Sequence, residues 1–261
     1  MSQTPAPLTS NAERYRVKTP DGRMYQWGAD RFVSVTTILS ALGKPWLGAW
    51  AAKMAAEYAY DNRNVWTELP KIEATKLIKS APWDTRDKAG NLGTAVHDAI
   101  EAHILSEPLP EYSDTVAPRM SHFEQFLIEY EPHFFASEAV VFSKQHRYAG
   151  TLDAIAEIGG ETLLIDVKTS KSVYPEFALQ LAAYKYGQWL GLPNGDAAPM
   201  PEIDGAAVLH ITPKGYRLIR VRCDEEVFRH FLYVAQCWRW MKEVAPTAIL
   251  DDVAIPPRRA A

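Results

Sequence analysis

The feature that most constrains the fold is the glycine pair Gly159-Gly160, which separates two runs that favour β-strands, residues 151–158 and 162–168. Two consecutive residues with positive φ form the type I′ turn of a two-residue hairpin, and glycine adopts that conformation without steric cost. If Ile158 pairs with Glu161, Asp153 faces Asp166. The glycine pair therefore predicts both a β-hairpin and its register.

This register places charged side chains together on one face of the hairpin. Side chains alternate between the two faces of a strand, so Thr151, Asp153, Leu164, Asp166 and Lys168 share a face, and Thr151 lies opposite Lys168. Directly opposed carboxylates repel each other unless a cation compensates, and Mg²⁺ or Mn²⁺ prefers such oxygen ligands. The hairpin therefore predicts a divalent metal site in which Lys168 orients or deprotonates a water. The alternative is a solvated hairpin with scattered charges.

Four short motifs, in a fixed order, resemble those of a known family. They are Gly93-x-x-x-His97, Gly150-Thr-Leu-Asp153, Asp166-Val-Lys168-Thr169 and Gln180-x-x-x-Tyr184. In this order they resemble the motifs of the PD-(D/E)XK nuclease superfamily, within the RecB-like branch that includes phage recombination exonucleases. The resemblance covers residues 93–184, about a third of the chain.

The resemblance implies an α/β (mixed α+β) fold with a restriction-endonuclease-like core, in which helices flank a central mixed β-sheet, and an N-terminal helical extension. The implied function is a metal-dependent DNA exonuclease that hydrolyses phosphodiester bonds from DNA ends in phage or bacterial recombination or repair. The implied cofactor is one or two Mg²⁺ or Mn²⁺ ions. The implied partners are DNA with free ends, single- or double-stranded, and a single-strand annealing or recombination protein.

The resemblance also implies roles for individual residues. It implies that Asp153, Asp166 and Lys168 are catalytic, and that His97 and the carbonyl group of Val167 help the two aspartates to bind metal. The implied substrate-binding residues are Thr169, Gln180 and Tyr184. Two further candidates are Glu138, which matches a glutamate common in the family, and Glu101, four residues after His97. The structural alternatives are a half-buried histidine, ordinary glutamates and a plain amphipathic helix that carries Gln180 and Tyr184.

Two other functions stay open. One is a structure-specific or restriction-like DNA endonuclease on the same fold. The other is a catalytically inactive DNA-binding module, which would be expected to have lost a carboxylate or the lysine. Asp153, Asp166 and Lys168 are all present, so the sequence favours an enzyme.

Composition excludes some classes of protein. A net charge of −4 argues against a protein that binds nucleic acid through charge alone, because neutralising phosphates requires clustered lysine and arginine. Cys223 and Cys237 are too few to ligate an iron–sulfur cluster with four cysteines. There is no apolar run of membrane-spanning length and no signal-peptide pattern at the start, so we expect a cytoplasmic protein with no membrane partner.

We expect four regions along the chain. They are a disordered leader at residues 1–12, a hairpin and helical extension at 13–83, the nuclease core at 84–250 and a tail at 251–261. A helix is predicted at residues 46–60, where Trp46 and Trp50 share a face as core residues or, alternatively, as platforms for unpaired bases. Pro82 predicts a break between helices at 70–80 and 84–105, and a further helix is predicted at 176–190.

Overall fold

The computed structural model describes residues 7–10, 12–20 and 22–250. The strands are β1 (Arg16–Thr19), β2 (Gly22–Trp27), β3 (Asp30–Ser34), β4 (His133–Ser143), β5 (Tyr148–Ile158), β6 (Glu161–Lys168), β7 (Trp189–Gly191), β8 (Ala197–Pro199), β9 (Gly205–Thr212) and β10 (Gly215–Val221). The helices are α1 (Val35–Leu39), α2 (Pro45–Asp61), α3 (Arg63–Trp66), α4 (Lys71–Ile104), α5 (Ala117–Tyr130), α6 (Glu176–Lys185) and α7 (Glu225–Arg239). Short helical turns are η1 (Ala12–Arg14), η2 (Trp240–Val244) and η3 (Ala245–Thr247).

The strands in the described part of the chain form one mixed sheet of ten strands, in which β5 is the central member. Along one side β5 pairs antiparallel with β4. On its other side, Tyr148 and Ala149 pair parallel with β3, whereas residues 154–158 pair antiparallel with β6. β5 therefore changes neighbour between Ala149 and Ala154, and Asp153 lies in the gap where the described strands leave this side of β5 unpaired.

The predicted hairpin register is confirmed over the paired part of β5 and β6. The pairs run from Ile158 with Glu161 to Ala154 with Ile165, and Gly159 and Gly160 have φ of 59° and 84°. The paired ladder ends at Ala154 with Ile165, so Asp153 and Asp166, the next residues in this register, are not themselves a ladder pair. Instead, the backbone N–H of Val167 donates to the Asp153 carboxylate at 2.7 Å.

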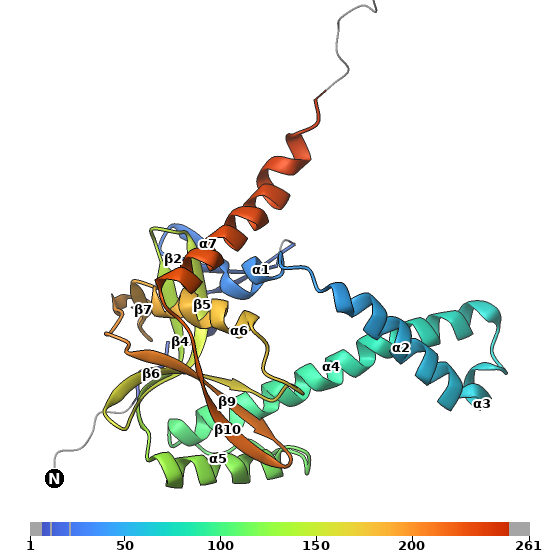
Figure 1. Ribbon diagram of the computed structural model, residues 1–261, viewed down its shortest axis with the longest axis horizontal. Coiled ribbons are helices and arrows are strands. Elements are labelled where there is room, and N and C mark those ends of the chain that lie inside the picture. Colours follow the sequence, from blue (N-terminus) through green and yellow to red (C-terminus); the bar gives the residue numbers. More distant parts are fainter. Residues whose placement is uncertain (1–6, 11, 21, 251–261) are drawn as a thin grey trace, which may run out of the picture.

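Helices cover both faces of the sheet, as predicted (Figure 1). One face packs on α1, α6 and α7 through a core that includes Leu164, Leu181 and Phe231. The other packs on α4 and α5 through a core that includes Phe123 and Ile165. The predicted fold class, a mixed α/β sheet flanked by helices with an N-terminal hairpin region, is therefore confirmed.

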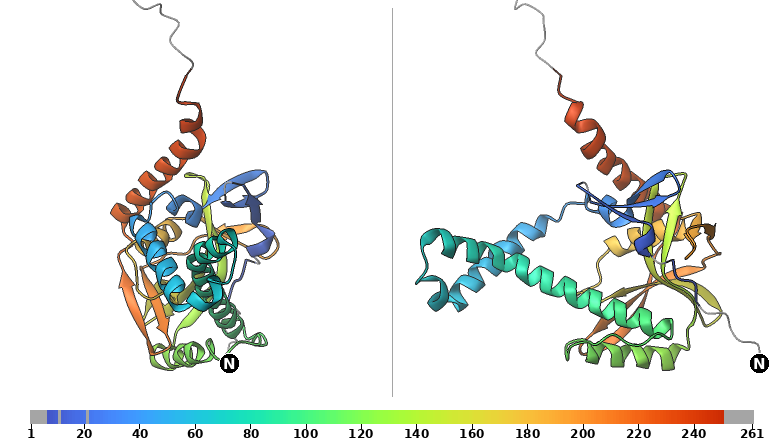
Figure 2. Two further views of the ribbon diagram at one scale, coloured as in Figure 1. Left: turned by 90° about the vertical axis from the view of Figure 1, so that its right-hand side faces the viewer. Right: turned by 180° about the vertical axis from the view of Figure 1, so that it is seen from behind.

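A helical arm projects from this core (Figures 1 and 2). It consists of α2, α3 and the first half of α4, with α2 and α3 packed on α4. α2 has no buried residue, and Trp46 is 51% exposed while Trp50 is half-buried. The prediction that these tryptophans are core residues is therefore wrong for Trp46, because α2 extends away from the sheet.

The long helix α4 differs from the sequence-based prediction. It is 34 residues long and continues through Pro82, so the predicted break there is wrong. The predicted boundary between the helical extension and the core, at residues 83 and 84, falls inside this helix. α4 packs against α2 and α3 in the arm and against α5 and β4 in the core, and these contacts hold the helix despite the proline. Within the described ranges, no helix combines the length and apolar character needed to span a membrane.

Two other segments differ from expectation. The helix predicted at residues 176–190 ends at Lys185, and residues 189–191 instead form β7 beside β4. Part of the predicted disordered leader belongs to the fold, because Leu8 bridges to Ala136 and buried Ser10 donates to the carbonyl of Gly191 at 2.6 Å. The rest of that leader, residues 1–6 and 11, and the predicted tail at 251–261 lie outside the described residues.

Candidate metal centre and its cleft

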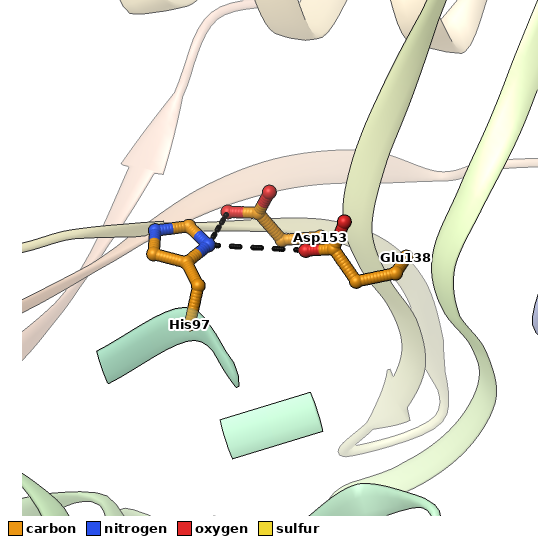
Figure 3. Close-up of side chains that lie close together, drawn as sticks. All are labelled: His97, Glu138 and Asp153. Atoms are coloured by element: carbon orange, nitrogen blue, oxygen red, sulfur yellow. Dashed lines mark ion pairs between the residues drawn. The ribbon is translucent and has the colours of Figure 1, made fainter. Parts of the chain in front are cut away.

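Three side chains from three different elements meet at the gap beside β5 (Figure 3). His97 comes from α4, Glu138 from β4 and Asp153 from β5. The Nδ1 atom of His97 lies 3.5 Å from Asp153 Oδ2 and 3.9 Å from Glu138 Oε1. One ligand atom from each residue lies within 4.8 Å of the others, so this triad could hold a metal ion.

Local structure explains why these side chains converge. α4 buries Val96, Ala99 and Ile100 beneath the sheet, which leaves His97 at the margin of the buried stripe. Glu138 lies between the residue pairs Ala139–Leu152 and Ser137–Ala154 of the β4–β5 ladder, opposite Asp153. Its φ of 45° is left-handed, a conformation that L-residues seldom adopt within a strand. The break in the ladder and this backbone conformation accompany the approach of the Glu138 carboxylate to His97.

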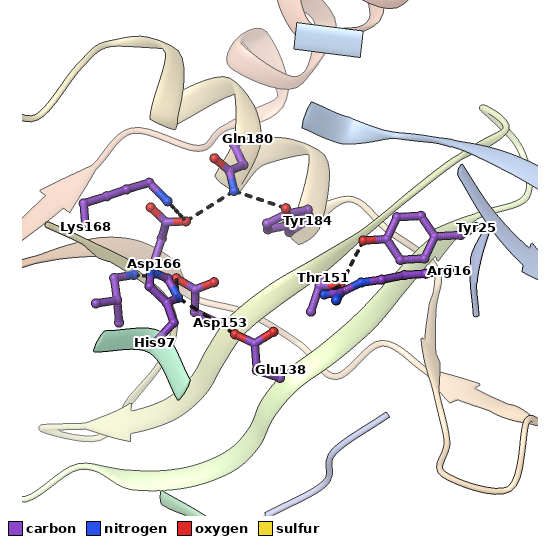
Figure 4. A network of polar contacts seen from close by, with 11 residues as sticks. Arg16, Tyr25, His97, Glu138, Thr151, Asp153, Asp166, Lys168, Gln180 and Tyr184 are labelled. Carbon is purple, nitrogen blue, oxygen red and sulfur yellow. Dashed lines mark hydrogen bonds and ion pairs between the residues drawn. The ribbon is translucent and has the colours of Figure 1, made fainter. Parts of the chain in front are cut away.

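A second group of polar side chains adjoins the triad (Figure 4). Asp166, which is 1% exposed, accepts hydrogen bonds at Oδ1 from Lys168 Nζ at 2.6 Å and Gln180 Nε2 at 3.3 Å. Gln180 also donates to the hydroxyl of Tyr184 at 3.1 Å. The Tyr184 ring lies against Gly150, where an added Cβ would be only 2.6 Å from Cε1 of that ring. α6 thus contacts β5 through Tyr184 and β6 through Gln180, and these two side chains face the site.

The second oxygen of Asp166 stands out. Oδ2 is buried and has no hydrogen-bond partner among the described residues. Buried polar atoms in proteins are nearly always paired, so an unpaired carboxylate oxygen next to a His/Glu/Asp triad is where an additional ligand would be accommodated. This observation, together with a donor set of carboxylate oxygens and one imidazole nitrogen, fits a divalent cation.

The site concentrates negative charge. Burial opposes protonation of His97, but Asp153 and Glu138 outweigh it and raise its pKa to about 9. Burial raises the pKa of Asp166 to about 6, with Lys168 opposing and Asp153 adding to the shift. Burial disfavours the ammonium of Lys168, yet Asp166 and Asp153 raise its pKa. Without a cation, the carboxylates are thus compensated by protons on His97 and Lys168.

A cleft of about 560 Å³ opens onto this centre. The triad lines it together with Gln180 and Tyr184. Glu101, one turn of α4 beyond His97, also lines the cleft without belonging to the triad, and burial followed by repulsion from Glu138 raises its pKa to about 7.

The remaining predicted site residues lie around the end of β6. Val167 meets the site through its N–H, which donates to Asp153, whereas its carbonyl stays a predicted ligand. The hydroxyl of Thr169 lies 3.4 Å from where a Cβ of Gly93 would stand, so this residue borders α4. His210, which pairs with Lys168 across β9 and β6, contacts the carbonyl of Ser170 at 2.7 Å through Nε2 and thereby fixes the segment after the lysine.

Sequence reasoning missed a polar cluster at the other end of the cleft. Thr151 Oγ1 lies 2.9 Å from the Tyr25 hydroxyl, and Arg16 Nη2 donates to the same oxygen at 3.3 Å. Arg16 and Tyr25 are paired across the β1–β2 hairpin. The sequence places Thr151 on the face of Asp153, but no sequence signal connects Arg16 and Tyr25 of the distant hairpin to the site.

The fold and the site define a mixed α/β protein with a His/Glu/Asp triad that could hold a metal ion. No family model matches the chain, and no curated protein matches it. A solved structure described as "Crystal structure of SSO0001" is similar at 12% sequence identity and a TM-score of 0.33, covering 81% of this chain and 76% of the other. A similarity at this level does not bear on function.

Proposed function

We propose that the protein is a metal-dependent DNA exonuclease of the PD-(D/E)XK type. The observation that carries the proposal is the bonded pair of Asp166 and Lys168 at the end of β6, with His97, Glu138 and Asp153 beside it. His97, Asp153, Gln180 and Tyr184, which come from three of the motifs, line one cleft, and Gln180 connects it to Asp166. Neither a solvated hairpin nor a structural ion pair accounts for the unpaired Oδ2 atom of Asp166.

The residues present fit a hard divalent cation. His97, Glu138 and Asp153 would hold it, with Asp166 and the carbonyl of Val167 as further ligands. Mg²⁺ or Mn²⁺ in such a site lowers the pKa of water and stabilises negative charge on a phosphate. The proposal is that the site binds one or two such ions.

The protein's own residues would have distinct roles in hydrolysis. Lys168 would hold the attacking water and balance the charge of the scissile phosphate, since its ammonium already lies at Asp166. Gln180 bridges Asp166 and Tyr184, so it would orient the phosphate relative to the carboxylate. Thr169 and Tyr184 would also bind the substrate. Glu101 lines the same cleft and, because its pKa is raised to about 7, would add negative charge there above that pH.

We prefer an exonuclease to an endonuclease because the motifs that contain His97, Gln180 and Tyr184 resemble those of nucleases that act on DNA ends. The proposed substrate is DNA with free ends, and the proposed partner is a single-strand annealing or recombination protein. The phage or bacterial setting and the cytoplasmic location belong to the same proposal.

The test is digestion of end-labelled linear DNA and of covalently closed circles, each single- and double-stranded, with Mg²⁺, Mn²⁺ or EDTA. We expect metal-dependent loss of linear DNA only. Asp166→Asn and Lys168→Met should lower the rate by roughly 100-fold or more, because each removes a charge at the reacting phosphate. Glu157→Gln is the matched control, since Glu157 is an exposed carboxylate farther along β5.

The outcomes separate the three functions. Cleavage of circles with the same dependence on Asp166 and Lys168 would replace the exonuclease with an endonuclease. Binding of DNA without cleavage under any of these conditions would favour the inactive DNA-binding module. Equal activity of Asp166→Asn and the wild type would show that the proposed site is not where hydrolysis occurs.

A further inference from the structure

A second groove, of about 360 Å³, continues from the cleft between α1, α2 and α6. Its walls are formed by apolar and aromatic side chains with one charged residue of each sign. They are Leu39, Leu42, Lys44, Trp46, Glu176 and Phe177. Thr36 and Gln180 line both this groove and the cleft of the metal centre, so the two spaces are continuous. We call it the Trp46 groove.

The Trp46 groove begins one side chain away from the candidate catalytic residues. The ammonium of Lys168 lies 5.1 Å from the centre of the Phe177 ring, and Phe177 forms part of the groove wall. Gln180 donates to Asp166 at 3.3 Å. A strand whose phosphate lies at Asp166 and Lys168 would therefore extend directly into the groove.

Trp46 is placed to contact a ligand rather than the core. Its side chain is 51% exposed, and no residue of α2 is buried. The ammonium of Lys44 lies 5.8 Å from its ring, at the same wall of the groove. Tyr60 on the same helix is 86% exposed but does not belong to this wall, which makes it a natural comparison.

The side chains of the groove are better suited to a nucleobase than to a phosphate. Lys44 and Glu176 balance each other, so the groove has no excess of positive charge for a phosphate. Two aromatic rings and two leucines instead offer flat apolar surface, and the carboxylate of Glu176 can accept hydrogen bonds from amino groups. An exposed nucleobase has these complementary properties, and base–aromatic stacking is tolerant of sequence.

We infer that the Trp46 groove binds an unpaired nucleobase, stacked on Trp46, next to the nucleotide held at the metal centre. The inference rests on the proposed function and makes it more specific, because it assigns a single-stranded end as the substrate. In a duplex, neighbouring bases cover the faces of each base and pairing occupies its edge. A base must leave the duplex before it enters the groove.

The test is the affinity of the full chain for a fluorescent single-stranded oligothymidine of 12 nucleotides, measured by anisotropy in EDTA. We expect Trp46→Ala to weaken binding by about 5-fold to 150-fold, the range that corresponds to the loss of one stacked base. Trp46→Phe should retain most of the affinity, and Tyr60→Ala should leave it unchanged. The salt dependence of binding should be the same in all variants, because no phosphate contact is removed.

A scan of abasic positions locates the base. Removing a single base should weaken binding to the wild type at one position and should have no further effect on Trp46→Ala. Equal binding by Trp46→Ala and the wild type, or equal losses for Trp46→Ala and Tyr60→Ala, would overturn the inference. So would equal losses on a blunt duplex and on the single strand.

Failure of this inference is distinguishable from failure of the proposed function. If the wild type degrades DNA with metal while Trp46→Ala binds and cuts normally, the inference is wrong and the nuclease stands. If the wild type neither binds nor degrades DNA, both are wrong. Because Trp46 is exposed, thermal unfolding of Trp46→Ala should match that of the wild type.

Discussion

At the scale of single residues, Glu138 combines an unfavourable backbone conformation with a place in the triad. Its φ of 45° is left-handed, and an L-residue there costs roughly 1–2 kcal/mol that glycine avoids. Strain of this kind persists where surrounding structure imposes it and is frequent at functional sites. The carboxylate, not the backbone, is therefore the reason for a glutamate at this position.

Replacing Glu138 separates these two contributions. In EDTA, Glu138→Gly should be more stable to urea than Glu138→Ala by about 1 kcal/mol, because only glycine relieves the strain. Both variants should lose affinity for Mn²⁺. The same pair at Glu157, an exposed position of β5, should show the opposite order, since glycine weakens a regular strand. Equal stability of Glu138→Gly and Glu138→Ala would contradict this explanation.

Glu101 should make the metal-free protein sensitive to pH. Burial and repulsion from Glu138 raise its pKa to about 7, above that of an unfolded glutamate near 4.5. The folded state thus binds a proton that the unfolded state has already released, and stability is lost as pH rises from about 4.5 to about 7.

Glu101→Gln should remove this loss. In EDTA, the gain in urea midpoint of Glu101→Gln over the wild type should be larger at pH 8 than at pH 4.5. The other titrating groups contribute equally to the stability of both proteins, so their contributions cancel in this difference. A gain independent of pH would show that the Glu101 carboxyl has the same pKa in both states.

At the scale of elements, α4 joins the arm to the metal centre. Its first half packs against α2 and α3, and its second half carries His97 and packs beneath the sheet. Pro82 interrupts the hydrogen bonding within the first half, because proline has no N–H to donate to the carbonyl of Ile78. The hydrogen bonding of the helix is therefore weakened at Pro82, just before its exposed stretch at residues 83–91.

Pro82→Ala should strengthen the first half of α4. A proline inside a helix costs about 3 kcal/mol relative to alanine, which exceeds the packing lost from this buried ring. Hydrogen exchange of the amides in residues 71–81 should slow, and exchange at β5 should not change. Pro70→Ala, at the helix N-cap, should have little effect. Faster exchange in Pro82→Ala would mean that the proline's packing dominates.

At the scale of the whole molecule, the triad connects layers that are otherwise joined by apolar packing. His97 belongs to a helix on one face, whereas Glu138 and Asp153 belong to the sheet. A cation bound by all three would stabilise the folded state, because the unfolded chain does not hold them together.

Metal should therefore raise the thermal unfolding temperature. At a concentration 100 times its dissociation constant, Mn²⁺ should add about 2.7 kcal/mol, or roughly 5–10 °C. His97→Ala should abolish the increase, and Glu157→Gln should retain it. An equal shift in His97→Ala and the wild type would place the binding site elsewhere.

Local patterns predicted the central part of the fold well. The glycine pair determined the register of β5 and β6 because a two-residue turn leaves no freedom in which residues oppose each other. The proximity of His97 to Asp153 followed from the resemblance and not from spacing. No local rule could predict that Asp153 accepts from the Val167 N–H, since this depends on β3 and β6 sharing one side of β5.

The arm was harder to predict because its helices pack on each other and not on the sheet. Trp46 has the apolar character of a core residue, and only the direction in which α2 leaves the core exposes it. Proline normally interrupts a helix, yet α4 continues through Pro82 because it packs against α2 and α3 in the arm and against α5 and β4 in the core. The cluster of Arg16, Tyr25 and Thr151 depends on contacts between residues 126 and 135 positions apart in the sequence.

The close contact between Tyr184 and Gly150 has a consequence for how such a sequence can diverge. A methyl group at position 150 would overlap the tyrosine ring, so a larger residue can arise there only after position 184 has become smaller. Either order of substitution passes through an intermediate with a clash or a void. The two positions should therefore change together or not at all among descendants of this chain, and a saturation library should recover substitutions at position 150 only alongside substitutions at position 184.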